Sequence, residues 1–491
     1  MDSIKILITI IAHIIEGILG FIFFYLILLY FDIETVGYYG VLISFLEMFT
    51  FILDLGFAIA YLKIYSEIND PENKICNGTF LLIRLIQFMV YAVIIFVSTL
   101  FLPLDNFDPN VLYFFIGAYI LGFIGSHTII IILIRKKQIF KKTILVVSFS
   151  LTKIILLIIL RDYYISDLSL IAMVYFISNL TFFIINLLFF KSVKINMPTK
   201  EYLKKFFEYS YPFFLITTLQ IILINIDVLI VNQYVPINDV AVYFTAKKIY
   251  GYFYVIISGI GYILLTTFSK NIAMQKQEEN LLMIKETHKF LNLLFVPLIF
   301  IFILYSTEFI ALIFGQNYMK IGIILYILSF NIMLFLNYCA IETQLRALGK
   351  VMILAEISLL RTILTIVFMI IFISPEFINL GIIGAALAIV LAEIFTQIII
   401  RPIIYKKYGI GYYWGSFRNL AIMLCVFLLQ LYINSRFPYN ILFIPLFILF
   451  NISLYFLINY LLRGFSKEDI KFFFSIVNLK KIKESILSEM K

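Results

Sequence analysis

The stretch YPFFLITTLQIILINIDVLIVNQYVPINDVAVYFTAKKIYGYFYVIISGIGYILLTTFSK, residues 211–270, decides the fold class. It holds two apolar segments joined by the short turn 235–239, and each segment is long enough to cross a bilayer, which takes about 20 residues. Asp227 lies inside the first segment, and the pair Lys247 and Lys248 lies inside the second. A charge at the centre of a bilayer costs about 3 kcal/mol even on the most lenient scale. We therefore expect these side chains to face one another or a water-filled cavity.

The composition of the whole chain is that of a membrane protein. The 491 residues are 63% hydrophobic and only 14% charged, whereas a soluble domain carries about 25% charged residues. The stretch 6–30 is too long for the apolar part of a cleavable signal peptide, so we expect it to be a retained first span. The cysteines Cys76, Cys339 and Cys425 lack the spacing of a metal or redox pair, and we interpret them as small apolar fillers.

Apolar runs predict fourteen transmembrane helices, and therefore an all-α integral membrane protein. The predicted spans are 6–30, 38–62, 76–101, 111–134, 142–160, 168–190, 212–234, 240–268, 289–314, 321–342, 351–373, 380–401, 417–433 and 441–462. The loops on one side of these spans hold three of the 38 Lys and Arg residues, five lie within spans, and the other 30 lie on the opposite side. Loops rich in Lys and Arg stay in the cytoplasm. We therefore expect cytoplasmic N- and C-termini, and we interpret the net charge of +9 as a topology signal rather than a nucleic-acid surface.

Two pairs of similar segments indicate an internal repeat. Residues 33–39 (IETVGYY) resemble 237–243 (INDVAVY), and 135–159 resembles 346–370. The first pair has an offset of 204, and in the second pair Lys142 aligns with Lys350 and Lys153 with Arg361, each at an offset of 208. Six predicted spans, an even number, separate the copies, so both copies have the same orientation. We expect two six-helix lobes in a parallel repeat around a central cavity, plus two C-terminal helices.

The repeat predicts five parts of the chain. An N-lobe covers 1–190 and a C-lobe covers 212–401, and a basic cytoplasmic linker with a short surface helix joins them at 191–211. Residues 402–462 hold the last two spans, which either form a lipid-facing groove or pack against the core. The tail 463–491 has apolar residues at helical spacing among lysines. This pattern predicts an amphipathic helix on the anionic leaflet, with a disordered charged tail as the alternative.

Ionisable side chains inside the predicted spans are the candidate functional residues, because such groups are costly in a membrane. The alternative for each is an ion pair inside one lobe. The basic candidates for a substrate-binding, cationic cavity are Lys247, Lys248, Lys153, Arg361 and Arg84. The candidates for coupling to an ion gradient are Asp227, Asp54, Glu16 and Glu47, and two further deep acids are Glu356 and Glu393.

Motifs of enzymes and motors are absent from the sequence. There is no Walker A loop, and no cluster of His, Cys and carboxylates has metal-ligand spacing. The predicted loops on the outer side have at most about ten residues, which leaves no room for an external catalytic domain. We expect no catalytic residues, no metal and no resident cofactor.

Short motifs follow one another in a characteristic order along nearly the whole chain. They are DLG at 54–56, YP at 211–212, the mid-span Asp227, YFTAKK at 243–248, FGQNY at 314–318 and ALGK at 347–350. In this order and spacing they resemble the polysaccharide-transporter branch of the multidrug/oligosaccharidyl-lipid/polysaccharide (MOP) exporter superfamily. Within that branch, the closest type is the flippase of O-antigen or capsule repeat units.

The resemblance implies a flippase that moves undecaprenyl-pyrophosphate-linked oligosaccharide across the bacterial cytoplasmic (inner) membrane for lipopolysaccharide or capsule synthesis. It implies alternating access, driven by an H+ or Na+ gradient. The implied partners are the lipid-linked oligosaccharide, membrane lipids, and a polysaccharide polymerase and glycosyltransferases, with no nucleic acid. A pyrophosphate is very unfavourable in a low-dielectric layer, which basic side chains along its path would offset.

A cation-coupled multidrug exporter of the same superfamily is the alternative function. Such a protein needs an acidic, aromatic cavity for cationic drugs. Six deep acids against five deep bases leave this alternative open. A non-transporting membrane scaffold fits poorly with so many charges inside the spans.

Overall fold

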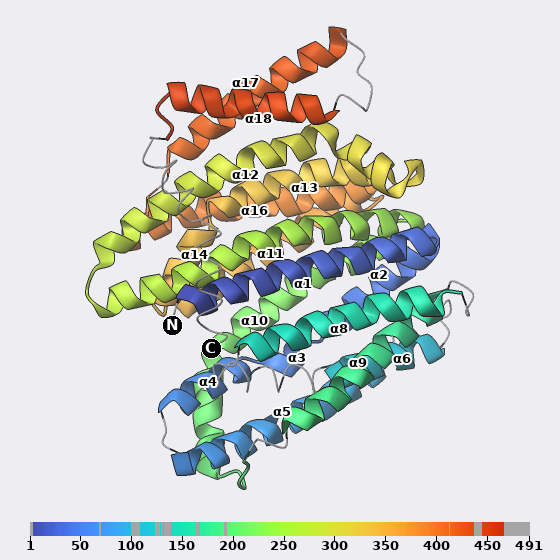
Figure 1. Cartoon of the computed structure of the whole chain (residues 1–491), viewed down its shortest axis with the longest axis vertical. Coiled ribbons are helices and arrows are strands. Elements are labelled where there is room, and N and C mark those ends of the chain that lie inside the picture. The colour runs from blue at the N-terminus through green and yellow to red at the C-terminus, as the bar shows by residue number, and fades with distance from the viewer. Residues whose placement is uncertain are drawn as a thin grey trace. The chain divides into compact units, whose positions relative to one another are not determined.

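The computed structural model describes residues 3–67, 70–99, 109–122, 128, 131, 139–162, 167–190, 194–411, 413–436 and 444–465. Within these ranges every regular element is a helix, which confirms the all-α class (Figure 1). The amphipathic helix predicted in the tail falls on residues outside these ranges from 466 onward.

The helices follow one another with short connections. Their bounds are α1 Ser3–Tyr30, α2 Ile33–Met48, α3 Phe51–Asp54, α4 Phe57–Glu67, α5 Asp70–Thr99, α6 Pro109–Leu121, α8 Ile139–Leu160, α9 Leu168–Phe190, α10 Lys200–Tyr234, α11 Ile237–Ala273, α12 Gln277–Phe314, η2 Gln316–Tyr318, α13 Lys320–Leu336, α14 Cys339–Ala347, α15 Val351–Ile373, α16 Gly381–Tyr408, α17 Gly415–Arg436 and α18 Ile444–Leu461.

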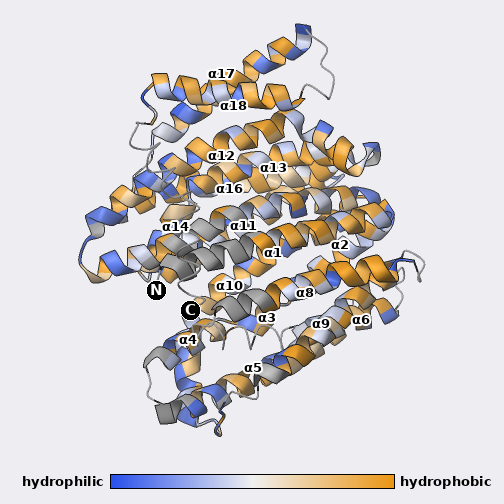
Figure 2. Cartoon of the chain, in the orientation of Figure 1, coloured by the Kyte–Doolittle hydropathy of each residue, from blue (hydrophilic) through white to orange (hydrophobic). Residues whose placement is uncertain are grey.

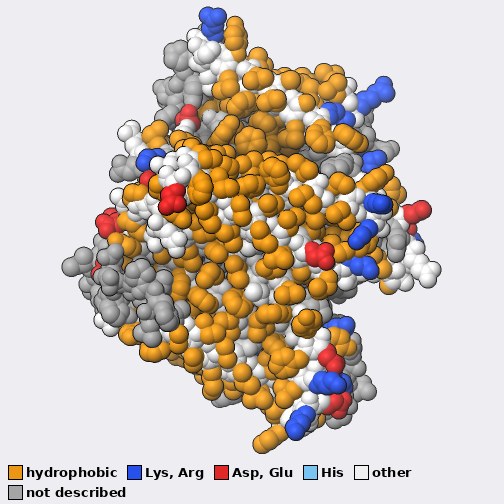
Figure 3. All heavy atoms as spheres, turned by 180° about the vertical axis from the view of Figure 1, so that it is seen from behind, with side chains coloured by type: hydrophobic (Ala, Val, Ile, Leu, Met, Phe, Trp, Pro, Cys, Tyr) orange, Lys and Arg blue, Asp and Glu red, His pale blue; other side chains and the backbone are white. Residues whose placement is uncertain are grey.

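The protein is a multi-pass membrane protein. Among the described residues, nine helices are long and apolar enough to cross a bilayer, and ten if the bent pair α13 and α14 is one span. Apolar residues run along these helices (Figure 2), and hydrophobic side chains cover most of the face seen in Figure 3. The predicted total of fourteen spans stays a prediction.

Proximity of Cα atoms divides the chain into two compact units. One unit holds Met1–Ile10, Ala246–Lys350 and Ile389–Lys491, and the other holds Ile11–Thr245 and Val351–Ala388. This division describes packing, and the predicted lobes, their linker and the central cavity stay predictions.

The surface helix predicted before the seventh span is not a separate element. Thr199 caps α10, because its hydroxyl accepts a hydrogen bond from the backbone N–H of Tyr202 at 3.4 Å. From Lys200 the helix then continues without a break to Tyr234. The expected short helix is therefore the first turns of the span itself.

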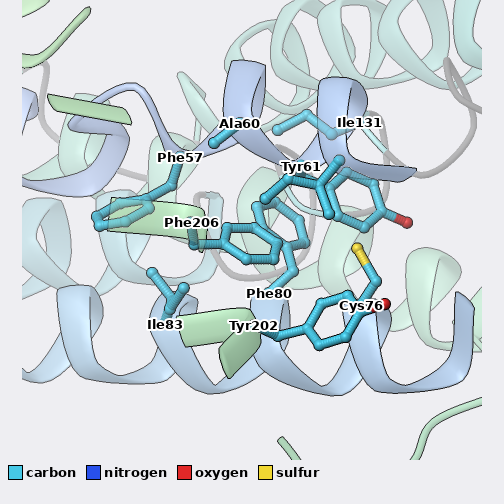
Figure 4. Close-up of a cluster of buried hydrophobic side chains, with 10 residues drawn as sticks. Phe57, Ala60, Tyr61, Cys76, Phe80, Ile83, Ile131, Tyr202 and Phe206 are labelled. Atoms are coloured by element: carbon cyan, nitrogen blue, oxygen red, sulfur yellow. The ribbon is translucent and has the colours of Figure 1, made fainter. Parts of the chain in front are cut away.

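The first turns of α10 are held by an aromatic cluster with α4 and α5 (Figure 4). The ring of Tyr61 on α4 stacks on Phe80 of α5 with 4.3 Å between centroids, and Phe80 lies parallel to Phe206 of α10 at 6.3 Å. The hydroxyl of Tyr61 donates to Asn77, whose amide donates to the carbonyl of Lys194. This cluster fixes the start of α10 against the preceding helices.

A second polar junction holds the bend between α13 and α14, whose axes differ by 41°. The bend lies at Asn337, whose side-chain oxygen accepts hydrogen bonds from Asn292 of α12 at 3.0 Å and Ser416 of α17 at 2.6 Å. Arg401 of α16 donates to the backbone carbonyl of Asn337. Three helices therefore satisfy the polar groups at this break.

The aromatic cluster makes a prediction about stability. Phe206 is fully buried, whereas its neighbour Phe207 is 59% exposed. Replacing a buried Phe by Ala costs about 3–5 kcal/mol because it leaves a cavity. Phe206→Ala should lower the thermal unfolding temperature of the purified protein far more than the matched control Phe207→Ala. Equal shifts for the two variants would contradict the packing described for α10.

Candidate functional site

Lys153 lies among three aromatic rings that come from three different helices. Its Nζ is 4.7 Å from the ring centroid of Phe149 on α8, 5.3 Å from Phe23 on α1 and 5.4 Å from Tyr175 on α9. We call these three rings the aromatic box. Aromatic faces attract a cation by about 0.5–2 kcal/mol, with the larger value where water is excluded. The ring contacts are therefore favourable for the ammonium of Lys153 in this half-buried position.

The local sequence explains part of this arrangement. Phe149 and Lys153 are four residues apart on α8 and so share one face of the helix. Phe149 stacks on Phe182 of α9 with 4.9 Å between centroids, which places α9 beside the lysine. Sequence spacing showed Lys153 inside a span, but it carried no sign of Phe23 and Tyr175, because these residues approach only through packing.

A group of aromatic residues continues from the box toward α2. The hydroxyls of Tyr175 and Tyr39 share a hydrogen bond of 2.7 Å. The ring of Tyr39 packs edge-on against Phe244 of α11, with 5.8 Å between centroids, and at a tilt against Phe115 of α6, at 6.3 Å. The box is thereby connected to the first half of α2.

The two copies of the predicted turn motif meet at this point. A Cβ on Gly40 would lie 2.7 Å from Cγ of Phe244, and a Cβ on Gly37 would overlap the carbonyl of Ile237. Only glycine permits so close an approach of α2 to α11. Positions 40 and 244 are equivalent at the offset of 204 residues. Contact between equivalent positions is what a two-fold repeat axis between them would produce.

Two of the predicted acidic candidates are held by tyrosines. Glu47, near the end of α2, accepts a hydrogen bond at 3.3 Å from the hydroxyl of Tyr119 on α6. Asp227 of α10 is 2% exposed and accepts at 2.7 Å from the hydroxyl of Tyr243 on α11. Sequence reasoning missed both tyrosines, although Tyr243 begins the YFTAKK motif.

Arg84 and Asp54 lie beside a break in the second span. Arg84 is 8% exposed, donates to the carbonyl of Leu53 and lies over the ring of Phe80, with 5.0 Å from its Cζ to the centroid. The charge of Asp54 is close enough to act on Arg84. Burial and this contact place the guanidinium inside the helix packing.

The other candidates differ in burial. Arg361, Lys247 and Lys248 are half-buried, whereas Glu16 is exposed. All five basic candidates are therefore buried or half-buried. Of the remaining acids, Glu356 is exposed, and Glu393 is buried and accepts from Gln397 at 2.7 Å. In the part of the chain that the structure describes, no three His, Cys, Asp or Glu side chains are placed to hold a metal ion.

Comparison with known proteins gives one family and one fold. Residues 4–272 match the sequence profile of the family described as polysaccharide biosynthesis protein. A search of curated protein sequences finds no significant match.

Several solved structures share the fold. The lipid II flippase MurJ in an inward closed conformation has a TM-score of 0.73 at 16% identity, with 93% of this chain and 98% of that chain covered. An inward-facing multidrug resistance MATE family transporter has a TM-score of 0.56 at 14% identity, covering 81% and 93% of the two chains. A MOP superfamily transporter from Pyrococcus furiosus has a TM-score of 0.54 at 14% identity, covering 82% and 96%.

The hydrogen bond to Asp227 makes a testable prediction. Tyr243→Phe removes the hydroxyl and leaves a buried carboxylate short of one donor, which costs about 1.5–3 kcal/mol for a charged partner. The control Tyr326→Phe removes a hydroxyl from a side chain that is 40% exposed. The thermal unfolding temperature should fall clearly for Tyr243→Phe and change little for Tyr326→Phe. A Tyr243→Phe protein as stable as the control would show that this bond does not support Asp227.

Proposed function

Because the chain belongs to the polysaccharide biosynthesis protein family, we propose that it is a flippase for a lipid-linked oligosaccharide. In this proposal the cargo is an undecaprenyl-pyrophosphate-linked repeat unit of O-antigen or capsule. It moves from the inner to the outer leaflet of the bacterial cytoplasmic membrane by alternating access. The protein performs no catalysis, and both of its termini are cytoplasmic.

The observation that carries the proposal is Lys153 in its aromatic box. An ion carried through a bilayer needs compensating charge, because an isolated anion in a low-dielectric medium is very unfavourable. The aromatic box holds a basic side chain among the helices by contacts with ring faces. A pyrophosphate oxygen can then displace the weaker contact with the rings and pair directly with the ammonium.

The other basic candidates extend this cationic path. Arg361, which aligns with Lys153 in the predicted repeat, and the pair Lys247 and Lys248 are half-buried. We propose that these side chains contact the pyrophosphate, and any acidic sugars, in successive states of transport.

An ion gradient drives the cycle in this proposal. Glu47 and Asp227 each have a tyrosine hydroxyl as a partner, and Asp54 lies near Arg84. A carboxylate with only a few hydrogen-bond partners can release them and bind a proton or Na+ when water enters the site. Glu16, which is exposed, is a weaker candidate for this role.

A multidrug exporter is the alternative proposal. Glu47 beside Tyr119 combines an acid with an aromatic ring, which suits a cationic drug, and MATE transporters share the fold. The phenotype of a strain that lacks the gene distinguishes the two functions. A flippase deletion loses surface polysaccharide with unchanged drug sensitivity, whereas an exporter deletion shows the reverse.

Neutralising the basic path tests the flippase directly. The quadruple variant Lys153→Gln, Lys247→Gln, Lys248→Gln and Arg361→Gln should reduce movement of lipid-linked oligosaccharide in inverted membrane vesicles by about 100-fold or more. Each charge-assisted hydrogen bond contributes about 1.5–3 kcal/mol, and two such losses already reach this factor.

The matched control neutralises four exposed lysines, Lys194, Lys204, Lys350 and Lys406. It should leave transport within a small factor of the unchanged protein. If the quadruple variant is folded and inserted yet transports as well as the control, the cationic path is wrong.

A further inference from the structure

The second span is broken twice, although its sequence is predominantly apolar. Helix α2 ends at Met48, the single turn α3 covers Phe51–Asp54, and α4 begins at Phe57. At the second break Leu55 has a φ of 43° and Gly56 a φ of 76°. This left-handed conformation is unusual for a leucine and ends the helical hydrogen-bond pattern.

A break inside a membrane frees backbone carbonyls that need other donors. Three side chains of α5 supply them. Arg84 Nη1 donates to the carbonyl of Leu53, Gln87 Nε2 donates to Ile52 at 2.9 Å, and the Tyr91 hydroxyl donates to Leu46 at 3.3 Å. Positions 84, 87 and 91 lie on one face of α5. We call these three residues the α5 ladder.

The break separates two packing groups within one compact unit. On the side of Gly56 toward α4, residues such as Tyr61 belong to the aromatic cluster with α5 and α10. On the α2 side, Tyr39 belongs to the aromatic group that includes Tyr175 of the box. Gly56 itself lies against α10, where a Cβ would be 2.9 Å from the carbonyl of Ser210. The two halves of the span therefore belong to different aromatic groups, although both also pack against α10.

The hydrogen bonds at the break are incomplete. Nε and Nη2 of Arg84 and Oδ1 of Asp54 are buried without a hydrogen-bond partner in the structure. The two side chains carry opposite charges, and Arg84 contacts the carbonyl of Leu53, the residue that precedes Asp54. Unmatched donors and an unmatched acceptor at one point indicate that a second arrangement can pair them.

We infer that residues 54–56 form a hinge within the second span and that Arg84 is the positioning residue that holds it in the present arrangement. When the hinge moves, Arg84 exchanges the carbonyl of Leu53 for the carboxylate of Asp54, and α4 tilts relative to α2. The inference rests on the proposed transport function, because the tilt is the part of alternating access that this span performs. It gives Arg84 a role in the hinge rather than in contact with the cargo.

Spin labels on the two halves of the span report the tilt. Glu34 on α2 and Lys63 on α4 have exposed side chains, and both become spin-labelled cysteines in every sample, in a background in which the exposed Cys425 is replaced by Ser. The distance between them is measured by pulsed electron paramagnetic resonance in purified, lipid-reconstituted protein without cargo. Arg84→Gln should shift the mean distance and broaden its distribution, and Arg84→Lys, which keeps one donor, should restore much of the original distribution.

Two further variants decide the result. Gln87→Leu removes the hydrogen bond from α5 to the carbonyl of Ile52. It should shift the distance between the labels in the same direction as Arg84→Gln does. Arg161→Gln, a change at an exposed arginine, should have no effect. Since no cargo is present, a shift supports the hinge even if the proposed cargo is wrong. An unchanged distance distribution in both Arg84→Gln and Gln87→Leu overturns the inference. If Arg84→Gln also binds the lipid-linked oligosaccharide more weakly, Arg84 contacts the cargo instead of holding the hinge.

Discussion

The structure depends on one constraint: a polar or charged group inside a membrane needs a partner from the protein itself. The constraint is visible wherever a helix is interrupted. At the break in the second span three side chains of α5 donate to freed carbonyls. At the bend after α13, Asn337 is held by side chains from α12, α16 and α17. Irregular backbone occurs in these spans where neighbouring helices complete its hydrogen bonds.

The same constraint explains how single charges are kept inside the helices. The ammonium of Lys153 lies against three aromatic rings from α1, α8 and α9, and such faces attract a cation. Asp227 is buried against a tyrosine hydroxyl. These two kinds of contact have different consequences. The contacts of Lys153 with the rings are weak enough to be replaced by a ligand, whereas the buried hydrogen bond between Tyr243 and Asp227 links α10 to α11.

Much of the fold was predictable from residue patterns alone. Long apolar runs predicted the helices. The similar segments 33–39 and 237–243 lie at the starts of α2 and α11, which contact each other at Gly40 and Phe244, one position beyond the two segments, and the repeat itself stays a prediction. The continuity of α10 was missed, because the basic, partly polar residues before Pro212 resemble a surface helix until their packing on α4 and α5 is known. Periodicity says which face of a helix is apolar, but it does not say what covers that face.

The candidate site was predictable only in part, and for a similar reason. A charge in an apolar run is visible in the sequence, so Lys153 and Asp227 were found. Their partners Phe23, Tyr175 and Tyr243 are ordinary aromatic residues among many, and only tertiary packing distinguishes them. The roles of Arg84 and Asp54 at the break in the second span could not be predicted either, because no sequence pattern indicates that a side chain donates to a backbone carbonyl such as that of Leu53.

Nuclear magnetic resonance of lysine labelled with 13C at Cε tests the central claim most directly, with the Lys153 signal assigned by its loss in Lys153→Arg. The account predicts a signal displaced by the ring currents of Phe23, Phe149 and Tyr175, which moves toward the ordinary lysine position when undecaprenyl pyrophosphate is added to the reconstituted protein. A Lys153 signal at the ordinary position from the start, or one that stays fixed at saturating lipid pyrophosphate, would contradict it.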